Sequence, residues 1–251
     1  MVPWSGSAIS AISAVKDLDT MAERKRRLVI AIDGPVGAGK STVARRLAQA
    51  LEYIYIDSGA MYRAMGWKAV QAGVDIRDRH RVVAVAATTE IRIVASPSGP
   101  RVLVDEQDVT DDLRTPSMDE ASSVVSTYPE VRERLVALQR EIATDGGIVM
   151  DGRDIGTVVF PHADVKVYLD ADLAVRAARR LEDLRKRGTA PAFDVVQADV
   201  LRRDARDRGR EASPLMVAPD AISIDSTSLT VDEILFQMLA VVGKVLEPDK
   251  S

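Results

Sequence analysis

The sequence contains no cysteine and only two histidines among its 251 residues. Without thiols the chain forms no disulfide, uses no thiolate nucleophile and builds no cysteine-based metal site. Two histidines, His80 and His162, are too few for a histidine-centred zinc site, and a Ser-His-Asp hydrolase is disfavoured for the same reason. We expect His162, which follows Phe160-Pro161, to be a turn residue. Chemistry in this chain therefore depends on Lys, Arg, Asp and hydroxyl side chains.

Long apolar runs are also missing. No hydrophobic stretch approaches the roughly 20 residues that a membrane-spanning helix needs, so no membrane partner is expected. The first 20 residues are small and polar, without the basic start and apolar stretch of a secretory signal. We expect residues 1–27 to be a flexible N-terminal extension, with Met21 as an alternative start, and the protein to be cytoplasmic.

An excess of positive charge is absent, since 34 Lys and Arg face 38 Asp and Glu for a net charge of −4. This balance disfavours a general nucleic-acid binder. The charge is uneven, however, because residues 176–210 carry eleven Lys and Arg against six Asp and Glu. An arginine-dense segment in an acidic protein suits a small polyphosphate ligand. The basic run 24–27 indicates a solvated lead-in, so no stable nucleic-acid partner is expected.

Apolar runs and helical patterns alternate along the chain, which is 46% hydrophobic and 29% charged. Near-continuous apolar strands separated by helices are typical of a parallel sheet covered on both faces. The predicted class is therefore α/β, with a five-stranded parallel sheet whose ligand lies at the carboxyl ends of the strands. The predicted strands are 28–32, 53–57, 148–151, 165–170 and 221–224, and the predicted helices are 39–51, 59–72, 172–187, 192–209 and 231–246, the last opening at 225–228.

A different pattern occupies the middle of the chain and predicts an inserted domain at 73–145. Short alternating runs around a Ser-Pro-Ser-Gly-Pro turn indicate a β-hairpin. The core then comprises 28–72 and 146–251, and its segment 176–210 is expected to be an arginine-rich flap. The elements predicted within the insertion are helices at 79–89, 117–126 and 129–144 and hairpin strands at 91–94 and 102–104.

A complete phosphate-binding loop, Gly34-Pro35-Val36-Gly37-Ala38-Gly39-Lys40-Ser41, follows the first strand. It matches the pattern G-x-x-x-x-G-K-[ST], in which backbone N–H groups and a helix N-terminus surround a triphosphate. Lys40 would reach the outer phosphates, and Ser41 would ligate Mg²⁺ directly. Asp33 and Asp151 are candidates for orienting magnesium-bound water. The predicted ATP contacts in this region are Gly34, Gly37, Ala38, Gly39, Lys40, Ser41 and Thr42.

Three further clusters are expected at the same edge of the sheet. Alone, each has a structural interpretation as a helix cap, a salt bridge or a solvated charged face. Around a phosphate loop they favour a second bound phosphate, because arginine supplies fixed bidentate cations. The Asn-Lys-x-Asp motif by which GTPases read their base is absent. The clusters are Asp57-Ser58-Gly59-Ala60-Met61-Tyr62-Arg63, Asp151-Gly152-Arg153-Asp154, and the run 202–210, where Arg203, Arg206 and Arg210 are expected to share a helical face.

These motifs resemble those of bacterial cytidylate kinases over about Leu28 to Leu239. The block Asp151-Gly152-Arg153-Asp154-Ile155-Gly156-Thr157-Val158-Val159-Phe160-Pro161 is specific to that family, and Asp225-Ser226-Thr227 also matches. The resemblance implies a nucleoside monophosphate kinase that phosphorylates CMP and dCMP with ATP and Mg²⁺ by direct in-line transfer. It also implies that the insertion is a monophosphate-binding domain.

The resemblance further implies roles for individual residues. Lys40, Arg153 and Arg210 would be catalytic, and Arg176 and Arg179 would lie in the flap over ATP. The CMP contacts implied are Ser58, Ser123, Arg132 and Asp154 around cytosine, Arg63, Arg153 and Arg210 at the phosphate, and Arg203 and Asp207 at the sugar.

Two alternatives stay open. A kinase for another small acceptor, UMP or shikimate, is opposed by the Asp-Gly-Arg-Asp block and the large insertion. A nucleotide-dependent binding switch is opposed by the missing base-reading motif and by arginines suited to a second phosphate. A monomer is expected, and the sequence does not set the preference among CMP, dCMP and UMP.

Overall fold

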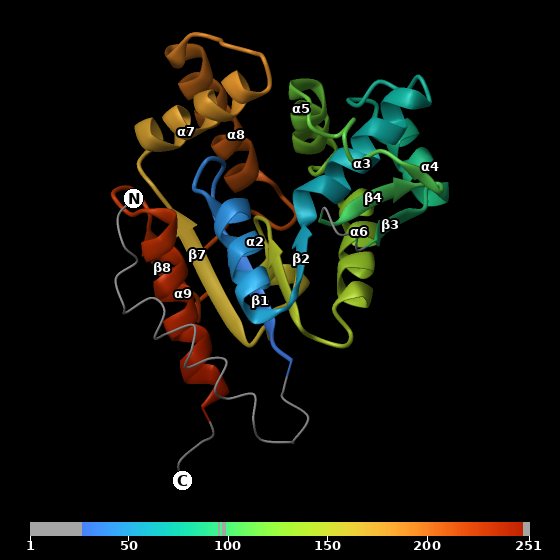
Figure 1. Ribbon diagram of the computed structural model, residues 1–251. Helices are drawn as coiled ribbons and strands as arrows, with labels where there is room; N and C mark the ends of the chain where they lie inside the picture. The colour runs from blue at the N-terminus through green and yellow to red at the C-terminus, as the bar shows by residue number, and fades with distance from the viewer. Residues whose placement is uncertain (1–26, 95, 97–98, 248–251) are drawn as a thin grey trace.

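The computed structural model describes residues 27–94, 96 and 99–247, and its centre is a five-stranded sheet in the order β2-β6-β1-β7-β8 (Figure 1). Every neighbouring pair in this sheet is parallel. The predicted α/β class with five parallel strands is therefore confirmed. The extension expected at residues 1–27 lies, except for Arg27, outside the described residues. The strands are β1(Val29–Asp33), β2(Ile54–Asp57), β6(Ile148–Asp151), β7(Val165–Asp170) and β8(Ile222–Asp225).

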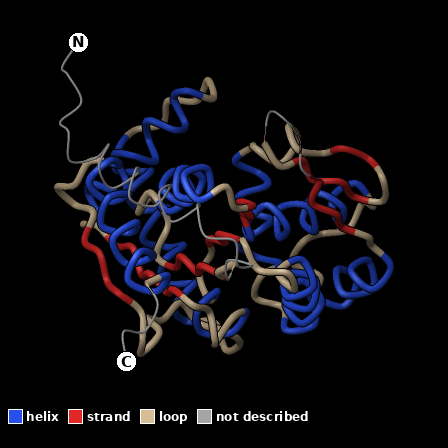
Figure 2. The backbone as a smooth tube through the Cα atoms, turned by 60° about the horizontal axis from the view of Figure 1, so that its bottom comes forward, coloured by secondary structure: helices blue, strands red, loops and turns tan. Residues whose placement is uncertain are grey.

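Helices cover both faces of the sheet, as Figure 2 shows from a second direction. Ile30 and Ile32 of β1 pack into a cluster with α2(Lys40–Leu51) and α9(Val231–Leu246). Ala31, which points the other way, packs with α6(Pro129–Ile142) and the π-helical turn η2(Ile155–Val159). Because both faces are buried, both sets of alternating side chains are apolar, which explains the continuous apolar runs.

The segment between β2 and β6 contains a second sheet, of three antiparallel strands, with its own apolar cluster. The predicted hairpin is confirmed, and the short strand that extends it was not predicted. The cluster begins within the helix that follows β2, at Met61 and Met65, and so precedes the predicted domain boundary at residue 73. The elements are α3(Ser58–Gln71), α4(Arg79–Thr88), β3(Ile91–Val94), β4(Arg101–Val104), β5(Gln107–Asp108) and α5(Pro116–Val125).

Two helices, α7(Leu173–Lys186) and α8(Phe193–Gly209), stand over the carboxyl end of the sheet (Figure 1). They pack on each other through Leu181, Leu184, Val196 and Val200. This pair carries the arginine-dense segment. Helix α5 lies across from the α7–α8 pair and contacts α8.

Helix α9 has the predicted bounds 231–246, but the residues that open it differ from the prediction. Strand β8 continues to Asp225, and the helix is capped at Thr230. The Thr230 hydroxyl accepts the Glu233 N–H at 3.3 Å, while a Glu233 carboxylate oxygen accepts the Thr230 N–H at 2.8 Å. This reciprocal capping box sets the start, so the expected opening at 225–228 is wrong. None of the described helices is long and apolar enough to cross a membrane.

Candidate active site

A cleft of about 1060 Å³ lies at the carboxyl edge of the parallel sheet. Its walls come from the phosphate loop, the start of α3, the turn after β6, and helices α5, α7 and α8. Three predicted contacts, Asp33, Gly34 and Arg176, do not line it. The predicted site residues that do line it are Gly37, Ala38, Gly39, Lys40, Ser41, Thr42, Ser58, Arg63, Ser123, Arg132, Asp151, Arg153, Asp154, Arg179, Arg203, Asp207 and Arg210.

The phosphate loop is shaped by close backbone contacts. Gly34 has φ +145°, and a Cβ there would lie 1.9 Å from the carbonyl oxygen of Leu169 in β7. Gly37 has φ +78°, and its Cβ would meet the Arg176 carbonyl oxygen at 2.6 Å. Both positions require glycine because the opposing atoms are backbone. Gly34 therefore seats the loop on the sheet instead of facing a ligand.

Lys40 is buried at the first position of α2, and its Nζ donates to the Pro35 carbonyl oxygen at 2.7 Å. Burial and the nearby positive charge of Arg153 lower its pKa to about 7. Gly39 caps the helix without any side-chain hydrogen bond. The residues of this first turn, including Lys40, line the cleft, and free N–H groups at a helix N-terminus favour a bound anion.

Ser41 and Asp151 provide neighbouring oxygen atoms beside this loop. Ser41 Oγ donates to Asp151 Oδ2 at 2.9 Å, and the Tyr55 hydroxyl donates to Oδ1 at 2.8 Å. Burial, and then the negative charge of Asp57, raise the pKa of Asp151 to about 6. The described residues include no group of three or more His, Cys, Asp or Glu that could hold a metal. A hydroxyl and one carboxylate nevertheless fit Mg²⁺, which takes its remaining oxygens from phosphates and water.

Asp33 ends β1 and holds the turn that follows β6. Its two carboxylate oxygens accept the N–H groups of Ile155 at 2.8 Å and Gly156 at 2.7 Å. The side chain is buried, and burial raises its pKa to about 6. The structure therefore places Asp33 under the Asp-Gly-Arg-Asp turn and outside the cleft, away from the magnesium-water role predicted for it.

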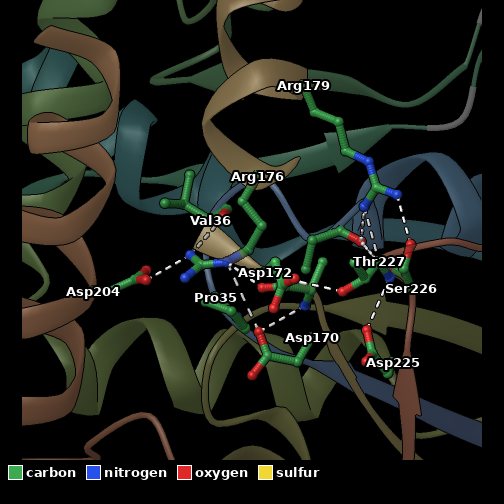
Figure 3. Close-up of polar contacts among 12 residues, drawn as sticks. Pro35, Val36, Asp170, Asp172, Arg176, Arg179, Asp204, Asp225, Ser226 and Thr227 are labelled. Atoms are coloured by element: carbon green, nitrogen blue, oxygen red, sulfur yellow. Dashed lines mark hydrogen bonds and ion pairs between the residues drawn. The ribbon is translucent and has the colours of Figure 1, made fainter. Parts of the chain in front are cut away.

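Arg176 and Arg179 fasten α7 to the outer side of the phosphate loop (Figure 3). Arg176 is buried and donates to Val36 O at 3.2 Å, to Ala171 O at 2.8 Å and to Asp204 Oδ2 at 2.5 Å. Arg176 lies outside the cleft lining. The geometry corrects its expected position over ATP, because the guanidinium supports the loop from behind.

Arg179 is held by Ser226, the central residue of the Asp-Ser-Thr motif (Figure 3). Its guanidinium donates to Ser226 O at 2.7 Å, Ser226 Oγ at 2.9 Å and Ala38 O at 3.4 Å. The Ser226 hydroxyl, fully buried, donates to Ala38 O at 3.1 Å. Ser226 was not among the predicted site residues, although its motif had been noted. Arg179 does line the cleft.

The opposite wall contains buried ion pairs. Arg132 and Asp154 form one, with side chains 3% and 6% exposed, and the Tyr62 ring lies under the Arg132 guanidinium at 5.4 Å. Arg153 Nε donates to Asp207 Oδ2 at 2.7 Å. Buried pairs like these lose much of their stabilisation to desolvation, and removing one partner leaves an uncompensated charge.

Two hydrogen bonds position the edges of this wall. Ser58 Oγ donates to the Asp151 carbonyl oxygen at 2.7 Å, which joins the start of α3 to the end of β6. Arg63 donates to Asp57 Oδ2 at 2.5 Å. Asp57 also caps α3 by accepting the Ala60 N–H at 3.1 Å, so the helix-cap interpretation holds together with a place at the cleft.

Three arginines of the 202–210 run, Arg203, Arg206 and Arg210, were expected to share a helical face but separate in space. Arg203 and Arg210 line the cleft, and burial lowers the pKa of both. Arg203 Nε and Arg210 Nη2 are buried without a hydrogen-bond partner in the described part of the chain. Arg206 instead donates to Ser123 Oγ at 2.6 Å and pairs with Glu120 at 3.2 Å. The shared face is not observed, because α8 ends at Gly209 and Arg210 has extended backbone angles.

Comparison with known proteins agrees with this geometry. A sequence model of the family "Cytidylate kinase" matches residues 30–244. A cytidylate kinase of Geobacillus kaustophilus is 48% identical over 220 residues, 88% of this chain and 98% of that protein. A cytidylate kinase of Anoxybacillus flavithermus is 46% identical over 223 residues, which cover 89% of this chain and 99% of that protein.

Among solved structures, a shikimate kinase of Acinetobacter baumannii aligns at 16% identity with a TM-score of 0.43, covering 88% of this chain and 95% of that kinase. The family match spans far more than half of the described chain, and it includes the phosphate loop, the Asp-Gly-Arg-Asp turn and the α7–α8 pair. The chain belongs to the cytidylate kinase family.

Proposed function

We propose that this chain transfers the γ-phosphoryl group of ATP to CMP and dCMP, giving ADP and CDP or dCDP. One observation carries the proposal: a single cleft joins a complete phosphate loop to a second wall of buried, incompletely paired arginines. The segment 73–145 would hold the monophosphate, and 176–210 would act as the flap. We also propose that the protein is a monomer and that it acts in the cytoplasm.

On the donor side, the N–H groups of residues 37–42 and the Lys40 ammonium would hold the β- and γ-phosphates of ATP. Arg179 lies beside Gly39, with its Nη1 4.0 Å from where a Cβ would be, and would add positive charge there. Ser41 would bind Mg²⁺ directly and Asp151 through water. When bound, the ion supplies neutralisation of the charge that develops between donor phosphates.

On the acceptor side, Arg63, Arg153 and Arg210 would bind the monophosphate, and Arg203 and Asp207 the sugar. Cytosine presents an amine donor beside two acceptors. A carboxylate such as Asp154 complements the amine, while Arg132, Ser58 and Ser123 supply donors. Uracil reverses part of this pattern and would leave buried groups unpaired, which is how polar sites reject close analogues.

The chain's contribution to the reaction would be positioning and charge. No general base is needed, because the attacking phosphate oxygen is already ionised. Lys40, Arg153 and Arg210 would screen repulsion between the two nucleotides and stabilise charge in the transition state. Closure of the α7–α8 pair would exclude water and so protect ATP from hydrolysis.

The proposal is tested by a coupled ADP-release assay with ATP and Mg²⁺ against CMP, dCMP, UMP, AMP, GMP and shikimate. Turnover confined to CMP and dCMP supports it. Turnover on another acceptor would keep the donor side and reject the base assignments. Tight ATP binding without turnover on any acceptor would instead favour a nucleotide-dependent switch.

A further inference from the structure

Asp119, in the first turn of α5, is the carboxylate around which arginines of the cleft gather. Its Oδ2 accepts from Arg180 Nη2 at 2.6 Å, and Arg187 Nη1 lies 3.7 Å from the same oxygen. Arg63 Nη1 lies 3.8 Å from Oδ1. All four side chains line the cleft. Asp119 therefore joins α5 to α7 and draws in an arginine of α3, across the space between insertion and flap.

Asp119, Arg180 and Arg63 are largely shielded from water, Arg187 is 37% exposed, and Asp119 is ionised among them. The side chains of Asp119 and Arg180 are each 12% exposed, and that of Arg63 is 18% exposed. Burial acts to raise the pKa of Asp119, but the charges of Arg180, Arg203 and Arg63 together hold it below its usual range. The carboxylate is thus a stable internal anion at neutral pH.

A carboxylate and a phosphate make the same kind of contact with a guanidinium group. In the absence of an anion, several arginines in one shielded cleft repel one another, and Asp119 relieves that repulsion. When a phosphate enters, it brings its own charge, and Asp119 becomes a like charge close to it. The Asp119 carboxylate therefore stabilises the cleft when no phosphate is bound and destabilises the complex when a phosphate is bound.

We propose that Asp119 is a resident counter-ion of the phosphate-binding arginines, which it holds through Arg180 and for which it competes with substrate phosphates. This inference rests on the proposed function, since it assumes that the arginines receive phosphates. Asp119 acts through other side chains and is a positioning residue. By weakening ground-state binding it would aid release of the product, a step that limits turnover in many enzymes that close over their substrates.

The test compares Asp119→Asn with Glu120→Gln, two variants that each remove one negative charge with little change in shape. Glu120 is the next residue of α5, has a 40% exposed side chain and pairs with Arg206. Binding of inorganic pyrophosphate, measured calorimetrically without nucleotide, should be about tenfold tighter in Asp119→Asn than in the wild type. Glu120→Gln should change it less than about twofold, because solvent and salt screen an exposed charge.

Steady-state kinetics supply a second readout. Asp119→Asn should lower KM for CMP without raising kcat, the signature of tighter ground-state binding. A residue needed only for structure would raise KM or lower stability instead. Asp119→Ser, which removes the same charge, is measured in parallel so that one well-folded variant suffices.

Pyrophosphate binding that is equal to or weaker than wild type, in a variant with unchanged melting temperature, would overturn the inference. In that case Asp119 shapes the arginine cluster instead of competing for it. The proposed function fails separately, if the wild-type chain turns over no nucleoside monophosphate. Pyrophosphate has no base, so its binding reports on the phosphate-binding groups of the cleft and does not depend on recognition of cytosine.

Discussion

Burial moves the pKa values of three side chains beside the phosphate loop toward neutrality. The pKa of Lys40 is lowered to about 7, and the pKa values of Asp33 and Asp151 are raised to about 6. In each case the low-polarity surroundings disfavour the charged form. A polyphosphate arriving at the loop reverses the balance for Lys40, because its negative charge favours the ammonium. Proton exchange is therefore expected to accompany nucleotide binding.

The first prediction is that ATP binding at pH 8 takes up protons through Lys40. At that pH the ammonium, with a pKa of about 7, is largely deprotonated in the absence of nucleotide, and bound phosphates raise its pKa. Calorimetry in two buffers of different ionisation enthalpy should report uptake approaching about one proton. Lys40→Met should abolish the uptake and lower kcat by at least about 10²-fold. Lys68→Met, which affects a lysine paired with Asp105, is the control. If Lys40→Met took up as many protons on ATP binding as the wild type, Lys40 would not be the group that is protonated.

The second prediction concerns Asp154, whose buried partner is Arg132. Asp154→Asn keeps the shape but replaces one carboxylate oxygen by an NH2 donor, on the side chain that we propose binds the cytosine amine. We expect kcat/KM for CMP to fall about 10²-fold while that for UMP changes much less, since a buried unpaired polar group is costly. Competition assays with the two nucleotides measure the ratio, and KM for ATP serves as the control. An unchanged preference for CMP would exclude a role of Asp154 in base selection.

At the scale of elements, each of the five parallel strands ends in an aspartate: Asp33, Asp57, Asp151, Asp170 and Asp225. Four of the carboxylates accept backbone N–H groups from a segment beyond a strand, as in the Ala171 and Thr227 N–H groups bound by Asp170 and Asp225. Asp151 instead accepts the hydroxyls of Ser41 and Tyr55. The carboxyl ends of parallel strands leave backbone groups without ladder partners. These aspartates therefore organise the loops that form the cleft.

Helix α7 depends on the buried pair of Arg176 and Asp204, which supplies the third prediction. Arg176→Met or Asp204→Leu alone should lower the free energy of unfolding by about 3–5 kcal/mol, because either leaves a buried charge unpaired. The double variant should recover much of this loss. Its KM for ATP should stay raised, however, because Val36 O has lost its donor. Urea denaturation measures the cycle, and strictly additive losses would show that the two side chains are not coupled.

The fourth prediction compares two glycines. Gly34→Ala places a Cβ 1.9 Å from a backbone oxygen at φ +145°, so it should lower the free energy of unfolding by more than about 3 kcal/mol and abolish ATP binding. Gly243→Ala in α9 meets no atom within 4 Å and should raise stability by about 0.5–1 kcal/mol. Urea denaturation of both variants is the measurement. Equal stability of the two would contradict the close seating of the loop on β7.

At the scale of the whole molecule, the cleft is assembled from segments far apart in the chain. Residues of the phosphate loop, of α5 in the insertion, and of α7 and α8 line one cleft. Figure 1 shows where these elements lie in the fold. The proposed donor and acceptor sites thus belong to different parts of the fold. Each nucleotide should therefore be bound, and should stabilise the protein, independently of the other.

The fifth prediction is that CMP alone, without ATP, raises the melting temperature. At 100 times its Kd a ligand adds about 2.7 kcal/mol, which corresponds to roughly 5–10 °C for a chain of this size. ATP alone should produce its own shift, and GMP should produce little. Differential scanning fluorimetry measures the melting temperature with each nucleotide. A shift with ATP but none with CMP is the result expected of a switch that has no acceptor site.

Local patterns were sufficient to predict most elements of the fold. The strands 148–151 and 165–170 were predicted with the bounds observed, because long apolar runs between turns admit few alternatives. The π-helical turn 155–159 was missed. Its shape depends on Asp33, more than 100 residues away, which accepts its first N–H groups, and no local pattern records that contact.

The candidate site was predicted as a set of motifs but not as an arrangement. Tyr55, Ser226 and Asp119 were not among the predicted site residues. Their local sequence is accounted for by an apolar strand for Tyr55, a capping motif for Ser226 and a charged helix for Asp119. Arg176 and Arg179, three residues apart on one helix, were assigned together to ATP. The structure separates them, since one is enclosed by carbonyl groups and Asp204 while the other faces the cleft.

The sequence by itself determined the class of fold, the phosphate loop and the family, because short motifs and apolar periodicity are local properties. Tertiary structure alone decided which charged side chains meet. It put Asp33 beneath the Asp-Gly-Arg-Asp turn, Arg206 on Ser123, and Asp119 among the arginines of two other helices. The pairing of charges depends on distances across the folded chain and on the exclusion of water from those positions. Local sequence patterns contain neither of these quantities.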